Sequence, residues 1–123
     1  MPSFAELADS ITYFAEERDW DKFHSPKNLV MALSVEASEL LEHFQWLTEE
    51  ESSNLNTEKL ALVSKEIADV QIYLIMLADR LGVDVLAASA SKLEENKIKY
   101  PADRVRGSAK KYSDYDDVPS GQL

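Results

Sequence analysis

Helix start and stop signals recur along this chain, and no stretch alternates between apolar and polar residues as a half-buried strand would. Ser25 followed by Pro26 is typical of a helix start, and Gly82 is typical of a helix end. Such signals predict four long helices, from the cap Ser3 to about Asp19, from the cap Ser25 to about Trp46, from the cap Thr57 to Leu81, and from the cap Asp84 to Pro101. We therefore expect an all-α chain that forms a four-helix bundle.

The segments between and after these helices are polar. Residues 20–24 form a connector, and Thr48 with Glu51 matches a capping box. That box predicts one short helical turn in an acidic loop that extends to Asn56. Beyond Pro101 the chain is rich in Lys, Ser, Tyr and Asp, which predicts an irregular tail.

Length and composition restrict the classes of protein to consider. The chain has 123 residues and a formal net charge of -10, from 13 Lys and Arg against 23 Asp and Glu. This length allows one core, so we expect one domain over 1–112 and a polar tail over 113–123. The absence of cysteine excludes disulfide frameworks, cysteine nucleophiles and cysteine-ligated metal sites. The acidic surplus argues against a nucleic acid polymer as partner, and an anionic ligand would need a cation to mediate its binding.

Targeting and membrane signals are not visible in the sequence. The N-terminus, MPSFAELADS, lacks a basic start followed by an apolar run. Nowhere do about 18 apolar residues follow one another without a charge. We expect a soluble, unprocessed, cytoplasmic protein without a membrane partner.

The third predicted helix is apolar on nearly all sides over its second half. In Val70 to Leu81, VQIYLIMLADRL, only Gln71, Asp79 and Arg80 are strongly polar. A helix with one solvent-exposed face would not have this pattern. A small bundle has only one core, which can cover only one face of the helix. The extra apolar face predicts an obligate oligomer with a helical interface.

The second predicted helix carries carboxylates within its apolar stripe. At about 100° per residue, Leu29, Leu33 and Leu40 fall within about 60° of Glu36. Glu39 lies on the other flank of Glu36, three residues further along. Side chains three apart are neighbours on a helix surface, so this helix presents a carboxylate pair toward the expected bundle interior.

The third predicted helix repeats this layout. Val63, Val70 and Leu77 lie beside Glu66, and Asp69 has the same offset from Glu66 as Glu39 has from Glu36. Four like charges on facing helices would repel one another unless they were protonated or shared a cation. An all-oxygen set suits Mg²⁺, or Mn²⁺, better than zinc. We therefore predict a metal site made of Glu36, Glu39, Glu66 and Asp69.

Two other readings of these carboxylates stay open at this point. In the first, the carboxylates face solvent, and the protein is a non-enzymatic acidic helical interaction module. In the second, the chain is a di-iron carboxylate bundle, which uses a Glu-x-x-His pattern on two helices. Against the second reading, Glu39 and Asp69 stand where histidines are needed, and His43 has no counterpart on the third helix.

Basic residues are concentrated near the end of the fourth predicted helix. Seven of the 13 lie between residues 92 and 111. Lys92, Asn96 and Lys99 share one helix face, with Tyr100 close by. Lysines there also complement the helix dipole, but beside a Mg²⁺ site we expect them to bind phosphates.

Trp20, His24 and Trp46 are aromatic residues in or near polar connectors. Tryptophans at helix ends most often cover a core. Two indoles at the same end of a bundle would instead sandwich a flat heterocycle. A metal site, a basic phosphate site and an aromatic clamp together describe a site for a nucleoside triphosphate.

Several segments resemble the MazG-like all-α nucleoside triphosphate pyrophosphatases, and among them the short dCTP pyrophosphatase group. The resemblance covers roughly Phe14 to Tyr112. It rests on FAEERDWDKFHSPKNL (14–29), VEASELLEHFQW (35–46), KEIADVQIYL (65–74), SKLEENKIKYP (91–101) and RGSAKKY (106–112).

The resemblance implies a house-cleaning enzyme that hydrolyses a dNTP, with dCTP or a modified dCTP favoured, to dNMP and pyrophosphate. It implies that Glu36, Glu39, Glu66 and Asp69 hold Mg²⁺. Glu36 and Glu39 would be catalytic, and Glu39 would orient or deprotonate the attacking water. It also implies a homodimer or homotetramer whose sites are built across subunits.

The resemblance further implies two groups of substrate-binding residues. Trp20, His24 and Trp46 would line the nucleoside pocket, with Tyr73 at the sugar or phosphates. The phosphates would be held by Lys92, Asn96, Lys99, Tyr100, Arg106 and Lys110. Two positions depart from the pattern. Val35 precedes Glu36 where many members have a second glutamate, and Ile11 stands where animal dCTP pyrophosphatases carry a histidine near the base.

Overall fold

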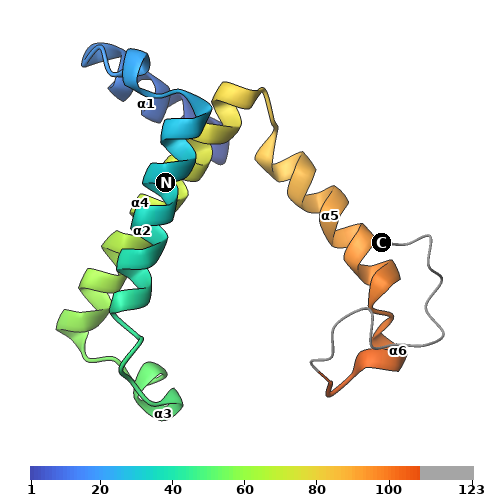
Figure 1. Cartoon of the computed structure of the whole chain (residues 1–123). Helices are drawn as coiled ribbons and strands as arrows, with labels where there is room; N and C mark the ends of the chain where they lie inside the picture. Colours follow the sequence, from blue (N-terminus) through green and yellow to red (C-terminus); the bar gives the residue numbers. More distant parts are fainter. Residues whose placement is uncertain (109–123) are drawn as a thin grey trace. The chain divides into compact units, whose positions relative to one another are not determined.

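All regular elements among the described residues are helical (Figure 1). The computed structural model describes residues 1–108. Its elements are α1 (Phe4–Glu17), the 3-10 turn η1 (Asp21–Phe23), α2 (Pro26–Glu42), α3 (Glu49–Ser52), α4 (Thr57–Leu81), α5 (Val85–Lys99) and α6 (Ala102–Val105). The predicted all-α class is confirmed, and closure into one four-helix bundle stays a prediction. Within residues 1–108, no helix is long and apolar enough to cross a membrane.

Most predicted helix ends form as expected. Ser3 Oγ accepts a hydrogen bond from the Glu6 N–H at 3.1 Å, and Glu6 Oε1 accepts one from the Ser3 N–H at 3.4 Å, which completes a capping box. Asp84 caps α5 by accepting from the Ala87 N–H at 3.0 Å. Gly82 ends α4 with a left-handed φ of 68°, a conformation that glycine adopts without a steric penalty.

Two predicted boundaries are wrong, one by about a turn and one by a single residue. α2 ends at Glu42 and not near Trp46, because the His43 and Phe44 N–H groups bond carbonyls three residues back, which tightens the chain into turns. The cap of α4 is Asn56, whose side chain accepts from the Lys59 N–H at 2.7 Å, and Thr57 is the first helical residue.

Two short elements form where irregular chain was predicted. The connector 20–24 contains η1, and the start of the predicted tail contains α6. Pro101 ends the preceding helix as expected and also stands at the cap position of α6, because proline is tolerated just before or at the first helical residue. The predicted boundary between residues 112 and 113 lies outside the described residues and stays a prediction.

The chain divides into two compact units, one over Met1–Val83 and one that begins at Asp84. In the first unit, α2 and α4 run side by side in opposite directions, and α1 contacts α4 (Figure 1). Its core is small, with Leu29 only 1% exposed. The buried apolar residues are Ile11, Ala15, Leu29, Val63, Ile75 and Ala78. In the second unit, α5 has no buried residue.

Candidate metal centre

Three of the four predicted carboxylates meet between α2 and α4. Glu36 and Glu39 of α2 and Glu66 of α4 each offer an oxygen, and these three oxygens lie within 4.8 Å of one another. All three residues are half-buried. The helix pair brings them together because α2 and α4 pack against each other, and the apolar stripe that holds Glu36 or Glu66 is the face by which such a helix packs.

The centre of this cluster is electrostatically unfavourable when it holds no cation. Glu36 Oε2 and Glu66 Oε2 are buried without a hydrogen-bond partner. The pKa of Glu36 is raised from 4.5 to about 7; burial is the largest cause, and the neighbouring Glu66 and Glu39 carboxyl groups contribute to the same shift. A buried acceptor without a partner costs about 1–3 kcal/mol. Glu36 and Glu66 therefore weaken the fold unless something positive, a proton or a metal ion, is shared among the three side chains.

The donor set fits a hard divalent cation. It consists of carboxylate oxygens from three residues, and the two orphaned oxygens are the atoms that such an ion would coordinate. His43, which the di-iron reading needs, is the C-cap residue of α2 and is not a member of the cluster. Oxygen-only ligation favours Mg²⁺ or Mn²⁺ over iron or zinc.

Asp69, the fourth predicted ligand, lies on α4 outside this cluster and is exposed. Tyr73, one turn further along α4, is half-buried. The structure therefore supplies three carboxylates where the sequence predicts four. Participation of Asp69 stays a prediction.

The aromatic residues do not share one end of the helix pair. Trp20 lies before α2 and is 42% exposed, whereas Trp46 follows α2 and is 88% exposed. A helix of 17 residues spans about 25 Å, so the predicted sandwich of both indoles is wrong for a single chain. Trp20 instead packs edge-on against Phe14 and His24, with ring centroids 5.6 Å and 6.4 Å away.

The predicted phosphate-binding residues belong mainly to α5. Lys92 and Asn96 line a shallow hollow on this helix, and Lys92 Nζ lies 3.9 Å from Glu95 Oε2. Lys99 is the last residue of α5, and the N–H of Tyr100 donates to the Asn96 carbonyl at 2.8 Å. Arg106 follows α6 and is exposed. Lys110 lies outside the described residues.

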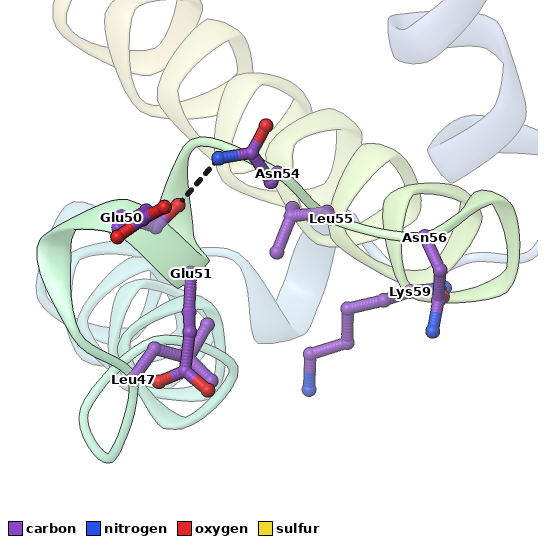
Figure 2. A pocket seen from close by; sticks show the side chains of 7 residues that line it. All are labelled: Leu47, Glu50, Glu51, Asn54, Leu55, Asn56 and Lys59. Carbon is purple, nitrogen blue, oxygen red and sulfur yellow. Dashed lines mark hydrogen bonds between the residues drawn. The ribbon is translucent and has the colours of Figure 1, made fainter.

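A hollow of about 590 Å³ lies between α3 and the start of α4, where the sequence predicted a short helical turn in an acidic loop and no hollow (Figure 2). It is lined by Leu47, Glu50, Glu51, Asn54, Leu55, Asn56 and Lys59. Leu47 and Leu55, two apolar residues in a polar segment, are the sequence signal for it. None of the clustered carboxylates lines this hollow, so we assign it no part in the metal centre.

Comparisons with known proteins decide the family. Residues 31–115 match the MazG-like family. The chain belongs to the MazG-like family. This MazG-like chain is 40% identical to the human and rat dCTP pyrophosphatase 1, over 99% of its own length and 71% of theirs. It also resembles the crystal structure of a pyrophosphatase from Archaeoglobus fulgidus, with a TM-score of 0.77, 39% identity, and coverage of 82% of this chain and 94% of the other.

These findings confirm the resemblance drawn from the motifs. The curated relatives and the solved structure are all pyrophosphatases, so the MazG-like chain is a hydrolase of the nucleoside triphosphate pyrophosphatase type. The family implies the use of a divalent metal, and the cluster of Glu36, Glu39 and Glu66 is the candidate place for it.

Proposed function

We propose that this protein is a Mg²⁺-dependent pyrophosphohydrolase that converts a dNTP to dNMP and pyrophosphate. The observation that carries the proposal is the trio Glu36, Glu39 and Glu66, with two buried oxygens that have no partner, in a MazG-like chain. The relatives named dCTP pyrophosphatase 1 support dCTP or a modified dCTP as the substrate. The cellular role would be house-cleaning of the nucleotide pool.

The three clustered carboxylates would hold the metal, and Asp69 would support its binding from the flank of α4. A bound Mg²⁺ or Mn²⁺ supplies positive charge that neutralises the phosphate oxygens and the leaving pyrophosphate. Glu36 and Glu66 hold fixed positions because their oxygens are buried between the helices. Glu39 lies on the flank of this pair, so its carboxylate could also accept a proton during the reaction.

Glu39 would act as the general base. The oxygen of a water molecule bonds to the α-phosphorus while the bond from that phosphorus to the bridging oxygen of the β-phosphate breaks. The proton of the water moves to the Glu39 carboxylate and then to solvent, and pyrophosphate leaves. Glu36 supports this step by holding its charge beside Glu39.

The substrate would be held by aromatic residues at its nucleoside and by positive and polar residues at its phosphates. Trp20, His24 and Trp46 offer flat or polar surfaces to a nucleoside, and Tyr73 reaches the sugar or the phosphates. Positive, amide and hydroxyl groups for the phosphates come from Lys92, Asn96, Lys99, Tyr100, Arg106 and Lys110. The exposed rings of Trp20 and Trp46 have the surface area that base stacking requires.

A second copy of the chain would complete the site. Leu60, Ile67, Leu74 and Leu81 lie seven residues apart along α4 and are all exposed. Such a stripe is typical of a helix that packs on another helix. Because Trp20 and Trp46 stand at opposite ends of α2, one subunit would supply Trp20 and its partner Trp46 to each nucleoside in a homodimer or homotetramer.

Subunit sharing has a direct test. Trp20→Ala and Trp46→Ala each weaken turnover at limiting dNTP, and an equal mixture refolded together forms mixed dimers with one intact site. Activity of the mixture should recover to about a quarter of the wild-type value, because half of the dimers are mixed and each holds one intact site of two. No recovery above the separate variants would contradict sharing.

The proposed reaction is tested with a panel of canonical and modified dNTPs and NTPs plus Mg²⁺, in which both pyrophosphate and phosphate are measured. We expect pyrophosphate and a monophosphate, fastest with dCTP or a modified dCTP, and no turnover with a chelator. Release of phosphate alone would contradict attack at the α-phosphorus. An acidic interaction module would show no turnover and a melting temperature that Mg²⁺ leaves unchanged.

A further inference from the structure

Two hydrogen bonds from outside fix the short turn η1. Arg80, in the last turn of α4, donates from Nη2 to the main-chain oxygen of Asp21, which is 59 residues away in the sequence. Asn28, in the first turn of α2, donates from Nδ2 to the main-chain oxygen of Phe23 at 3.0 Å. Both acceptors are carbonyls of η1, so the turn is tied to α4 at its start and to α2 at its end.

The chain also enters this turn in a fixed conformation. Asp19 has a left-handed φ of 54°, and the N–H groups of Asp19 and Trp20 donate to the carbonyls of Glu16 and Ala15, each at 3.0 Å. This pattern of paired bonds is a Schellman motif, which turns the chain sharply after a helix. Trp20 then packs edge-on against Phe14 of α1 at 5.6 Å.

Trp20 and His24 stand on either side of η1, with ring centroids 6.4 Å apart. A shift of the turn would therefore move both rings. We propose that Arg80 is a positioning residue for nucleoside recognition, which acts through the Asp21 carbonyl to hold Trp20 and His24 in place. The inference rests on the proposed function, in which these two rings contact the nucleoside.

The bond to the carbonyl, and not the nearby charge pair, carries this role. Arg80 Nη2 lies 3.7 Å from Asp21 Oδ1, and both side chains are partly exposed, at 37% and 49%. Exposed pairs at such distances contribute little. A charged donor to a carbonyl forms a stronger and more directional bond. Asp21→Asn keeps the carbonyl and is therefore the matched control for Arg80→Met.

The first measurement needs no nucleotide. The chain has two tryptophans, so in a Trp46→Phe background Trp20 is the sole tryptophan, and its emission can be excited apart from that of the tyrosines. Adding Arg80→Met should make Trp20 more accessible to acrylamide and weaken its near-ultraviolet circular dichroism, with unchanged helical content. Asn28→Ala should act in the same direction, and Asp21→Asn should have no effect. Unchanged quenching in both Arg80→Met and Asn28→Ala would overturn the proposal.

The second measurement separates positioning from general damage. Arg80→Met should raise KM for the best dNTP about tenfold, as expected for one lost charge-assisted hydrogen bond, with kcat within about twofold. The Ki of inorganic triphosphate, which has no base, should stay unchanged. Arg80→Lys, which keeps the helix-end charge and one donor, should restore part of the KM. A Ki that rises in parallel with KM would overturn the proposal.

The two arms also distinguish this inference from the proposed function. If the wild-type protein hydrolyses no nucleotide, the proposed function fails, and the fluorescence arm still decides whether Arg80 positions Trp20. If the wild-type enzyme is active but Arg80→Met leaves quenching and KM unchanged, only the positioning role fails.

Discussion

Helices α2 and α4 carry the same carboxylate spacing but contribute differently to the cluster. On α2, both Glu36 and Glu39 join the group. On α4, Glu66 joins it, whereas Asp69 at the same offset is exposed and outside the group. The difference teaches that spacing selects a helix face but does not by itself decide which carboxylates meet, and the shorter side chain of Asp69 is the explanation that can be tested.

The comparison also separates two kinds of carboxylate. Glu36 and Glu66 hold buried oxygens without partners, and the pKa of Glu36 is raised to about 7 mainly by burial. Glu39 and Asp69 occupy the flanks, and Asp69 is in contact with solvent. We therefore expect loss of Glu36 or Glu66 to change both the stability of the fold and the binding of the metal. Loss of Glu39 should chiefly lower kcat, and loss of Asp69 should chiefly weaken the affinity for Mg²⁺.

The largest effect is expected from Glu36→Gln or Glu66→Gln. Turnover should fall about a hundredfold or more, because the transition state loses several kcal/mol of stabilisation by the metal. The metal-free protein should at the same time become more stable by about 1–3 kcal/mol, since a repelling buried carboxylate is replaced by a donor. Kinetics with Mg²⁺ and thermal denaturation with a chelator check both signs.

Glu42→Gln is the matched control for this prediction. Glu42 is an exposed carboxylate on α2, so its loss should change neither activity nor metal-free stability. Loss of stability in Glu36→Gln or Glu66→Gln without metal would show that the buried carboxylates support the fold by themselves, contrary to the proposal.

The next effect compares the two flanks. Glu39→Gln should lower kcat about a hundredfold as the lost general base, whereas Asp69→Asn should weaken apparent Mg²⁺ affinity about tenfold, the scale of a supporting ligand. Steady-state kinetics over a Mg²⁺ titration separates kcat from affinity. Equal losses of kcat in both variants would mean that Asp69 on α4 has the same role in the reaction as Glu39 on α2.

Much of the fold was predictable because helix ends are local. Ser3, Ser25, Asp84 and Gly82 form the expected caps or stops, since each needs only neighbours within a few residues. The early end of α2 and the turn η1 were missed. The bond from Arg80 to Asp21 shows why, because the tertiary structure stabilises that turn and helical periodicity carries no signal for it.

The candidate site was predictable only as far as helix faces allow. Placing Glu36 and Glu66 in apolar stripes correctly brought them together between the helices. Asp69 could not be placed, because a periodicity argument gives the face of a helix and not the position that each carboxylate takes between two packed helices. The prediction that Trp20 and Trp46 lie at the same end was wrong, because both lie outside the regular helices and helical periodicity does not fix their positions. The observed length of α2 separates them.

A moderate effect is expected from pH in the metal-free protein. The folded-state pKa of Glu36 is about 7 against an ordinary value of 4.5, so between these values the folded chain keeps a proton that the unfolded chain has released. The stability from this group is complete below the ordinary pKa and is lost as pH rises toward the folded pKa. With a chelator present, the melting temperature of the wild-type protein should fall across that pH interval relative to that of Glu36→Gln. If the melting temperatures of the two proteins change in parallel with pH, the raised pKa of Glu36 is contradicted.

The smallest effect is expected from Asp69→Glu, which gives α4 the same pair of residues as α2. The added methylene should let the carboxylate reach the cluster, which adds a like charge without metal and a ligand with it. The metal-free melting temperature should therefore fall slightly, and the apparent Mg²⁺ affinity should rise about twofold. Asp9→Glu, the same change at an exposed position on α1, is the control. If Asp69→Glu behaves like this control, side-chain length is not the cause. The direction in which residue 69 projects from α4 would then explain why the two helices differ.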